Sequence, residues 1–304
     1  MENNTPLVSI IIVSYNCAAY ILETLESARA QTYQNIEIIV TDDGSRDNTP
    51  EIVETWLKIH TNRFKRSVIV RSEINTGTPK NCNRGLKASE GAWIKMVAGD
   101  DILLPHCVET MLRFSLSQKS LITTSDMIEF CDDNLPKRLG KSIRLEQMRF
   151  FKLRKDKQFQ SYLRNPVFLN SPALFINKEL FERVGYFDES FKILEDTPFI
   201  LKTLRAGYHI SYNEIQTIKY RTNQKAVERL DGQISDTLLC FTKYRLKYFS
   251  RYKLCDYLIR YNFFLFSRRR KSNSPLSRFL WENLTKFTDF LYIRKKIAEK
   301  IFDH

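Results

Sequence analysis

Short apolar runs that are rich in β-branched residues constrain the fold of this sequence more than any other feature. Each run lacks the strict polar and apolar alternation of a half-exposed strand, so it is typical of a strand that is buried on both faces. Amphipathic helical patterns over 19–32 and 45–60 separate the first three runs. Strands and helices that alternate in this way predict βαβ crossovers and a mostly parallel α/β sheet with helices on both faces. The runs are VSIIIVSY (8–15), IEIIVTDDG (36–44), SVIVRS (67–72) and WIKMVAGDD (93–101).

Polar and acidic residues gather where these runs end. In a parallel sheet the carboxyl ends of the strands lie at one edge, where loops and helix N-termini converge on ligands. Four carboxylates are expected at this edge, which predicts a ligand site there. The candidate residues at the strand ends are Ser14, Tyr15, Asp42, Asp43, Asp100 and Asp101.

The composition narrows the class of protein. The 304 residues are 43% hydrophobic, which is enough for a substantial core. Six cysteines without a C-x-x-C pair argue against a zinc site and a disulfide framework, so reduced thiols and a cytoplasmic location are expected. No stretch reaches the roughly 18 to 20 uninterrupted apolar residues of a transmembrane helix. The first residues also lack the pattern of a secretion signal.

The rest of the chain is less regular. Residues 133–165 are rich in Lys and Arg and weakly patterned, so we expect a surface excursion there. A strand, a helix and a turn are predicted over 171–190, and a helix that begins with acids over 194–210. Later patterns are helical. We therefore predict an α/β domain over 1–222 and a helical, basic tail over 223–304.

Six short motifs follow one another over residues 7–212: VSIIIVSYN, TDDGSRDNT, NTGTPKNCNRG, VAGDD, GYFDES and LEDTPF. Their order and spacing resemble glycosyltransferase family 2, whose fold is called GT-A. Each motif alone would be weak evidence, so the resemblance rests on the whole series. It implies an inverting enzyme that moves a sugar from a nucleotide donor, first of all a uridine diphosphate (UDP) sugar, to a hydroxyl of an acceptor.

The resemblance assigns the first two motifs to the nucleotide. It implies that the base stacks on Tyr15, beside Ser14, and that Asp43 accepts a hydrogen bond from the imide N–H of uracil. The neighbouring Asp42 is expected to be a turn acid, an acidic residue in the turn whose carboxylate accepts hydrogen bonds from nearby backbone amides.

The VAGDD motif places two carboxylates where a diphosphate is expected. Such a pair makes chemical sense with a bridging divalent cation, which prefers oxygen ligands. The resemblance implies that Asp101 holds Mn²⁺ or Mg²⁺ and that Asp100 binds the ribose hydroxyls. Relatives often have a further Asp where this chain has Ala98, which removes a polar contact and leaves the implied metal ligand in place. The alternative is that the two acids only end a strand and cap the helix from Pro105.

The LEDTPF motif supplies the candidate base. Inversion at an anomeric carbon needs a base on the face opposite the leaving group, and such a base typically contributes about 10²–10⁴ in rate. The resemblance implies that Asp196 is this base and that Glu195 orients it or touches the acceptor. Two adjacent acids should also raise one pKa. Acids are favoured in the first turn of a helix by its dipole as well, and the two interpretations are compatible.

A second departure from the family lies in NTGTPKNCNRG. Relatives usually have Ala-Arg-Asn where this chain has Asn81, Cys82 and Asn83, so a common basic residue is missing. Lys80 and Arg84 are the candidates to replace it. Cys82 is not expected to act as a nucleophile. This departure and Ala98 are the only support for the alternative of a nucleotide-sugar-binding module without efficient transfer.

The tail carries most of the formal net charge of +13, because residues 225–304 hold 18 Lys and Arg against 8 Asp and Glu. Basic residues interleaved with aromatic rings are typical of helices at an anionic membrane surface. The alternative is a helical subdomain that packs on the first domain with a solvated basic face. Nucleic acid is not expected as a partner, because charge alone supports it. The resemblance implies a glycan or a lipid-pyrophosphate-linked acceptor of a bacterial surface polysaccharide, at the inner face of the cell membrane.

Overall fold

The computed structural model of this chain describes residues 5–131, 145–164, 169, 171–222, 236–237 and 239–248. The chain divides into two compact units, Met1–Gln233 and Ile234–His304, and each is described by itself. The helical tail expected over 223–304, and the boundary expected before it, fall mostly outside the described residues. Both stay predictions.

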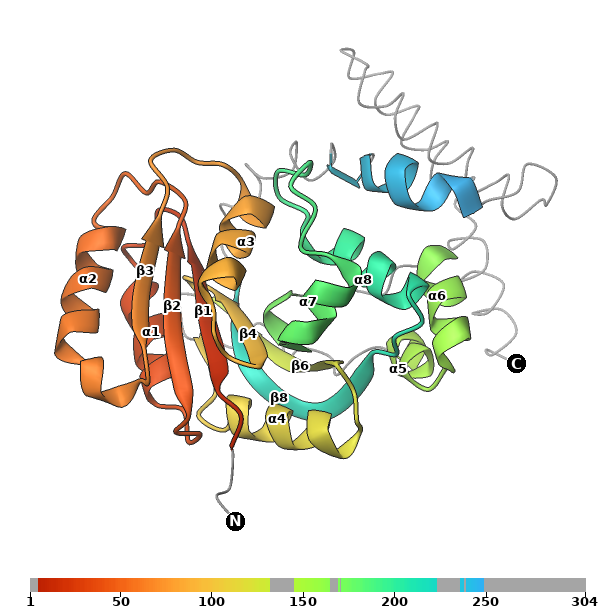
Figure 1. Cartoon of the computed structure of the whole chain (residues 1–304), viewed down its shortest axis with the longest axis horizontal. Helices are drawn as coiled ribbons and strands as arrows, with labels where there is room; N and C mark the ends of the chain where they lie inside the picture. The colour runs from red at the N-terminus through yellow and green to blue at the C-terminus, as the bar shows by residue number, and fades with distance from the viewer. Residues whose placement is uncertain are drawn as a thin grey trace. The chain divides into compact units, whose positions relative to one another are not determined.

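The first half of the sheet is parallel, as the apolar runs predicted. Three of its strands are buried along almost their whole length, and the register places Ser14 opposite Asp42 and Val13 opposite Ala98. The carboxyl ends of three neighbouring strands therefore lie at one edge (Figure 1). In spatial order the strands are β3 (Ser67–Arg71), β2 (Ile36–Asp42), β1 (Val8–Ser14) and β4 (Trp93–Ala98).

The sheet continues beyond β4 with β7 (Leu174–Asn177), β6 (Ile122–Phe130), β8 (Ser211–Arg221) and β5 (Ile102–Leu103). Strand β7 is antiparallel to both β4 and β6, β6 is parallel to β8, and β5 is antiparallel to β8. At the join the rings of Trp93 and Phe175 stack with their centroids 5.2 Å apart. The whole sheet is mostly parallel and belongs to the predicted α/β class. The sequence analysis did not predict β6 or β8.

The helices of the first 120 residues are α1 (Ile21–Arg29), α2 (Thr49–Ile59), α3 (Thr78–Ala88) and α4 (Cys107–Ser117). They cover both faces of the sheet (Figure 1). Successive side chains of a strand point to opposite sides, so each buried strand packs against helices on both faces. On one face Ile10 shares a core with Leu25 of α1 and Val53 of α2. On the other face α3 comes so close that a Cβ on Gly85 would lie 2.5 Å from Cγ2 of Ile11.

Residues 145–164 correct the surface excursion expected over 133–165. They form two helices, α5 (Leu145–Phe151) and α6 (Lys155–Arg164). The fully buried Gln158 anchors α6, since its amide donates to the carbonyl of Ile210 (3.0 Å) and accepts from the N–H of the same residue (3.0 Å). The many basic residues of this stretch obscured the few buried side chains that make it fold.

The expected helices after residue 171 are present. They are α7 (Lys178–Val184) and α8 (Asp196–Arg205), and the ring of Phe181 lies 4.7 Å from the ring of Phe199 between them. Two short 3₁₀ helices, η1 (Thr61–Arg63) and η2 (Ser171–Ala173), complete the first unit as far as it is described.

The described part of the second unit is a short helical segment. It contains a π-helical turn, η4 (Phe241–Arg245), and a 3₁₀ turn, η5 (Leu246–Tyr248). The guanidinium of Arg245 lies 5.2 Å from the ring centroid of Phe241. Within the described residues of both units, every helix is too short or too polar to cross a bilayer.

We expect Gly85→Ala to lower the free energy of unfolding by about 1–2 kcal/mol. The added methyl group must displace Ile11 or α3 in a close-packed core. The free-energy cost of this displacement exceeds the gain in helix propensity of about 1 kcal/mol. Urea unfolding measures the change. Lys87→Ala, at an exposed position of the same helix, is the control and should stay within about 0.5 kcal/mol of the parent. An unchanged midpoint for Gly85→Ala would contradict the close approach of α3.

Candidate active site

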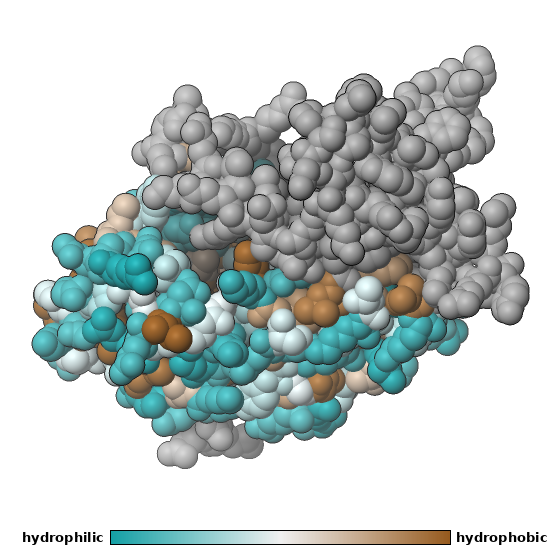
Figure 2. Space-filling view, turned by 90° about the horizontal axis from the view of Figure 1, so that it is seen from above, coloured by the Kyte–Doolittle hydropathy of each residue, from teal (hydrophilic) through white to brown (hydrophobic). Residues whose placement is uncertain are grey.

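The loops that follow β1 and β2 are hydrogen-bonded to each other. The N–H of Asn16 donates to the hydroxyl of Ser45 (2.8 Å), and the N–H of Arg46 donates to the side-chain oxygen of Asn16 (2.9 Å). Asn16 has a φ of 52°, a left-handed conformation that asparagine tolerates better than most residues. The turn leaves the ring of Tyr15 39% exposed, on a protein whose described surface in Figure 2 is largely hydrophilic. An exposed ring on a fixed loop is available for stacking.

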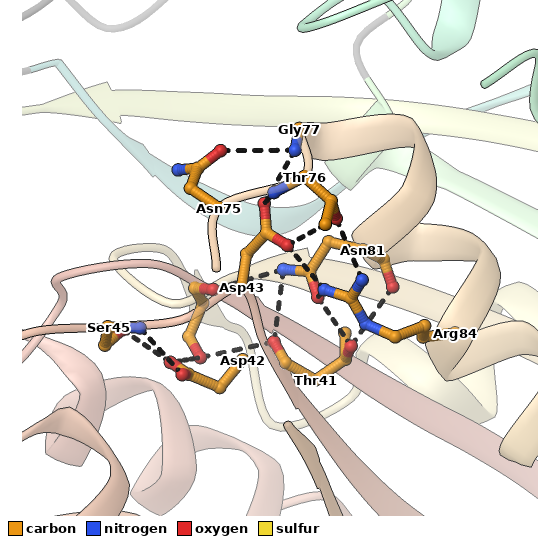
Figure 3. Close-up of polar contacts among 10 residues, drawn as sticks. Thr41, Asp42, Asp43, Ser45, Asn75, Thr76, Gly77, Asn81 and Arg84 are labelled. Carbon is orange, nitrogen blue, oxygen red and sulfur yellow. Dashed lines mark hydrogen bonds and ion pairs between the residues drawn. The ribbon is translucent and has the colours of Figure 1, made fainter. Parts of the chain in front are cut away.

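Ser14 and Asp42 are buried and support the turn after β2 (Figure 3). The hydroxyl of Ser14 donates to Oδ2 of Asp42 (3.1 Å), while Oδ1 of Asp42 accepts the N–H of Ser45 (2.9 Å). These contacts confirm Asp42 as a turn acid. Ser14 is only 1% exposed, and its contact with a nucleotide stays a prediction.

Asp43 is buried and accepts four hydrogen bonds (Figure 3). Its Oδ2 accepts the N–H groups of Thr76 (3.0 Å) and Gly77 (2.8 Å). Its Oδ1 accepts the hydroxyl of Thr76 (2.7 Å) and the guanidinium of Arg84 (2.5 Å). A carboxylate has about four acceptor sites, so all of them are in use. An N–H of a base can therefore bind to Asp43 only if one of these donors moves.

Arg84 and Lys80 are the two candidates to replace the basic residue that this chain lacks in the family motif, and the structure places them differently. From α3 its guanidinium reaches Asp43 and also donates to the side-chain oxygen of Asn81 (3.0 Å). Lys80, the other candidate, is exposed. Cys82 is buried, and burial, with Glu195 nearby, raises its thiol pKa well above the ordinary value. The thiol therefore stays protonated, as expected of a residue that is not a nucleophile.

The two acids after β4 lie in different environments. Asp100 is half-buried, whereas Asp101 is fully buried. Oδ1 of Asp101 accepts a hydrogen bond from the backbone N–H of Arg221 (2.9 Å), and its Oδ2 is buried with no hydrogen-bond partner among the described residues. Burial raises the pKa of Asp101 to about 8 and Asp100 adds to the rise, while Arg221 and Lys95 oppose it.

Asp100 and Asp101 fit a divalent cation whose remaining ligands come from a bound substrate. No group of three or more His, Cys, Asp or Glu side chains that could hold a metal occurs among the described residues. One or two carboxylates together with substrate phosphates are the usual site for Mg²⁺. The unpartnered Oδ2 of Asp101 is an oxygen that either a cation or a proton would satisfy.

Asp196 is the first residue of α8 and is half-buried. Its Oδ1 accepts the N–H and the hydroxyl of Thr197, while its Oδ2 makes no hydrogen bond within the part of the chain that the structure describes. Burial raises its pKa, and the two hydrogen bonds from Thr197 oppose the rise. Glu195 precedes it at the N-cap position, without a capping hydrogen bond from its side chain. The result is a carboxylate with one oxygen held and one available.

Helix α3 holds the segment that leads to Asp196. The side-chain amide of Asn83 donates to the carbonyl of Phe187 (2.9 Å) and accepts its N–H (3.1 Å). The N–H of Thr78 donates to the carbonyl of Lys192 (2.9 Å). The sequence analysis noted Asn83 only as part of a departure from the motif and did not single out Arg221. The alternation of apolar and polar residues in IQTIKYR was the available signal for the strand that Arg221 ends.

The model of the family described as glycosyl transferase family 2 matches residues 9–185. The chain belongs to this family. An uncharacterized glycosyltransferase of Rickettsia typhi is 30% identical over 243 residues, which are 79% of this chain and 70% of that protein. This chain is therefore a glycosyltransferase.

Two solved structures share the fold. S. aureus TarS 1–349, in complex with UDP-GlcNAc, has a TM-score of 0.54 and 22% identity and covers 72% of this chain and 59% of its own. The mannosyltransferase PcManGT from Pyrobaculum calidifontis, in complex with GDP-Man and Mn²⁺, has a TM-score of 0.59 and 17% identity and covers 79% and 64%. The GT-A fold predicted from the sequence is confirmed.

Asp101→Asn is expected to stabilise the metal-free protein above pH 8 by an amount on the order of a few kcal/mol. A carboxyl whose pKa is raised on folding contributes stability that is present below its unfolded pKa and is lost as the pH rises through the folded value, here about 8. The neutral amide escapes this loss, so its advantage should grow between about pH 4 and 8 and then level off. Thermal unfolding with a chelator across this range measures it, and a constant difference would contradict the buried carboxyl.

Proposed function

We propose that this protein transfers a sugar, with inversion, from a UDP-sugar to a hydroxyl of a glycan or lipid-linked glycan. The observation that carries the proposal is the state of Asp196. One of its oxygens is held by Thr197, the other is without a hydrogen bond among the described residues, and its pKa is raised by burial. A carboxylate in this state is a suitable general base for a hydroxyl.

The donor would bind at the carboxyl edge of β1, β2 and β4. Tyr15 offers an exposed ring for the base, and Asp43 offers an acceptor once one of its four donors moves. The UDP-GlcNAc that TarS binds on the same fold supports a uracil base, while the GDP-Man of PcManGT makes guanine the alternative to test.

The diphosphate would lie beside Asp100 and Asp101. Asp101 would hold Mn²⁺ or Mg²⁺, which when bound offsets the charge that develops on the diphosphate as its bond to the sugar breaks. The Mn²⁺ in PcManGT supports this assignment. Asp101 would direct its unpartnered Oδ2 toward the cation, while Asp100 is the more exposed of the two and would reach the ribose hydroxyls.

Asp196 would take the proton of the acceptor hydroxyl as the acceptor oxygen forms its bond to the anomeric carbon. The bond from that carbon to the diphosphate breaks on the opposite face, which inverts the configuration. Thr197 keeps Oδ1 of Asp196 in place, so the proton goes to Oδ2. Glu195, next to Asp196, would orient the acceptor.

The acceptor would be presented at a membrane. The basic, aromatic tail over 223–304 supports peripheral contact with anionic lipid at the inner face of the cell membrane, and a lipid-pyrophosphate-linked acceptor would be found there. A role in the synthesis of a surface polysaccharide follows from such an acceptor.

Asp196→Asn is expected to retain nucleotide-sugar binding and to lower kcat by about 10²–10⁴, because the amide has a similar shape but cannot take the proton. Calorimetry with UDP-sugars and GDP-sugars in Mn²⁺ measures binding, and single-turnover transfer measures the rate. In the parent, kcat should fall as the pH drops through the raised pKa of Asp196.

Glu195→Gln is the matched control for Asp196→Asn, and a much smaller loss of kcat is expected for it. Near-normal turnover by Asp196→Asn would place the base elsewhere, with Glu195 the first residue to examine. Tight binding of GDP-sugars with none of UDP-sugars would overturn the uracil assignment alone.

The tail should bind anionic vesicles more tightly than neutral ones. Added salt should weaken the binding, since screening limits the reach of each charge to about 8 Å at physiological ionic strength. Replacing Arg268, Arg269, Arg270 and Lys271 with Gln is expected to reduce vesicle affinity by a few kcal/mol, at about 1 kcal/mol for each residue. Flotation assays measure this. Donor hydrolysis in solution is the control and should not change, and equal flotation with neutral vesicles would refute a membrane role.

A further inference from the structure

Arg221, the last residue of β8, contacts both acids that follow β4. Its Nε donates to the backbone carbonyl of Asp100 (2.9 Å), and its backbone N–H donates to Oδ1 of Asp101 (2.9 Å). The Asp101 carboxylate is thereby turned so that Oδ1 is used within the protein and Oδ2 is left unpartnered.

The guanidinium of Arg221 is itself fixed from three directions. It lies 4.5 Å from the ring centroids of both Tyr20 and Phe130, so it makes cation–π contacts with two aromatic rings. Its Nη2 pairs with a carboxylate oxygen of Glu23 at 2.9 Å, and the residue is only 7% exposed. Residues before α1, within α1 and at the end of β6 therefore determine where this side chain lies.

The backbone around the two acids is bound to the same strand. The ladder between β5 and β8 pairs Ile102 with Lys219 and Leu103 with Ile218, directly after the acids. The chain from Asp100 to Leu103 thus follows the last four residues of β8. A shift of this strand end would move both carboxylates together.

We propose that Arg221 is a positioning residue. Its side chain holds the backbone at Asp100 and its N–H holds Oδ1 of Asp101, so the end of β8 sets where the two acids lie relative to the donor diphosphate and its cation. This inference rests on the proposed function of the acid pair. Lysine cannot replace arginine here, because one ammonium lacks the planar fork that donates to a carbonyl and a carboxylate while lying against aromatic rings. Loss of a residue that orients metal ligands typically lowers metal affinity by about 10–100-fold.

The test compares Arg221→Lys with Arg63→Lys. Arg63 is a matched control because its guanidinium also donates to backbone carbonyls, those of Arg29 (2.9 Å) and Gln31 (2.8 Å), and lies 5.2 Å from the ring of Phe64. It lies just before β3, toward the opposite edge of the sheet from the two acids. Calorimetry measures UDP affinity with Mn²⁺ and with a chelator, and thermal unfolding with a chelator measures stability.

For Arg221→Lys we expect the Mn²⁺-dependent part of the UDP affinity to fall by at least about tenfold. For Arg63→Lys it should stay within about twofold of the parent, even if both variants unfold at similarly lower temperatures. Glu23→Gln removes one anchor of Arg221 at a side chain that is 55% exposed, so it should fold normally and lose affinity in the same direction by a smaller factor. The pH at which kcat falls should not move in any of the three.

Affinity of Arg221→Lys equal to that of the parent, or an equal loss in Arg63→Lys, would overturn the positioning role and leave the proposed function intact. Failure of the parent itself to bind nucleotide sugars or transfer sugar would refute the proposed function, and the inference would fall with it.

Discussion

The burial of β1 and β2 on both faces is the constraint on which the rest of this structure depends. A polar group inside such a strand is costly unless its hydrogen bonds are satisfied. Glu37 shows what is required, since its carboxylate accepts from the hydroxyl of Ser9, the N–H of Gly91 and the guanidinium of Arg66. The candidate ligand-binding side chains are therefore found at the strand ends. The parallel register then gathers those ends at one edge, where Tyr15, Asp43 and the acids after β4 are found.

The parts of the fold that could be predicted from the sequence are those with local causes. The strands β1, β2 and β4 follow from continuous apolar runs, and the turn role of Asp42 follows from the short-range chemistry of an acid at the end of a strand, three residues before the N–H that it accepts. These local patterns were enough to predict the fold class and the position of the acids at the strand ends.

What could not be predicted depends on partners that are distant in the sequence. Arg221 lies 120 residues after Asp101, and the strand that it ends alternates too weakly to stand out. Three of the four hydrogen bonds to Asp43 come from Thr76 and Gly77, just before α3, and the fourth comes from Arg84 within α3, so the TDDG motif alone does not reveal that all acceptor sites of Asp43 are in use. Helix α6 is anchored by a few buried side chains, Gln158 among them, that stand between many exposed basic residues.

Helix α3 connects the donor side of the site to the candidate base. At its first turns Gly77 has a φ of 97°, and a Cβ there would lie 2.6 Å from the carbonyl oxygen of Lys192. Further along, Arg84 pairs with Asp43 and Asn83 binds the backbone of Phe187. A single helix thus contacts both Asp43, the residue proposed to bind the nucleotide base, and the segment that carries Asp196, the candidate general base.

The four hydrogen bonds of Asp43 would make the proposed binding of a nucleotide base an exchange of one hydrogen bond for another. A base N–H gains an acceptor only when Thr76, Gly77 or Arg84 gives one up, so the net free energy of the contact is the difference between two similar hydrogen bonds. Binding of the base and the conformation of the turn at Asn75–Gly77 are then one coupled equilibrium, in which each shifts the other by the same factor. A substitution in this turn would then change the affinity for the base, even if the substituted side chain touches no nucleotide.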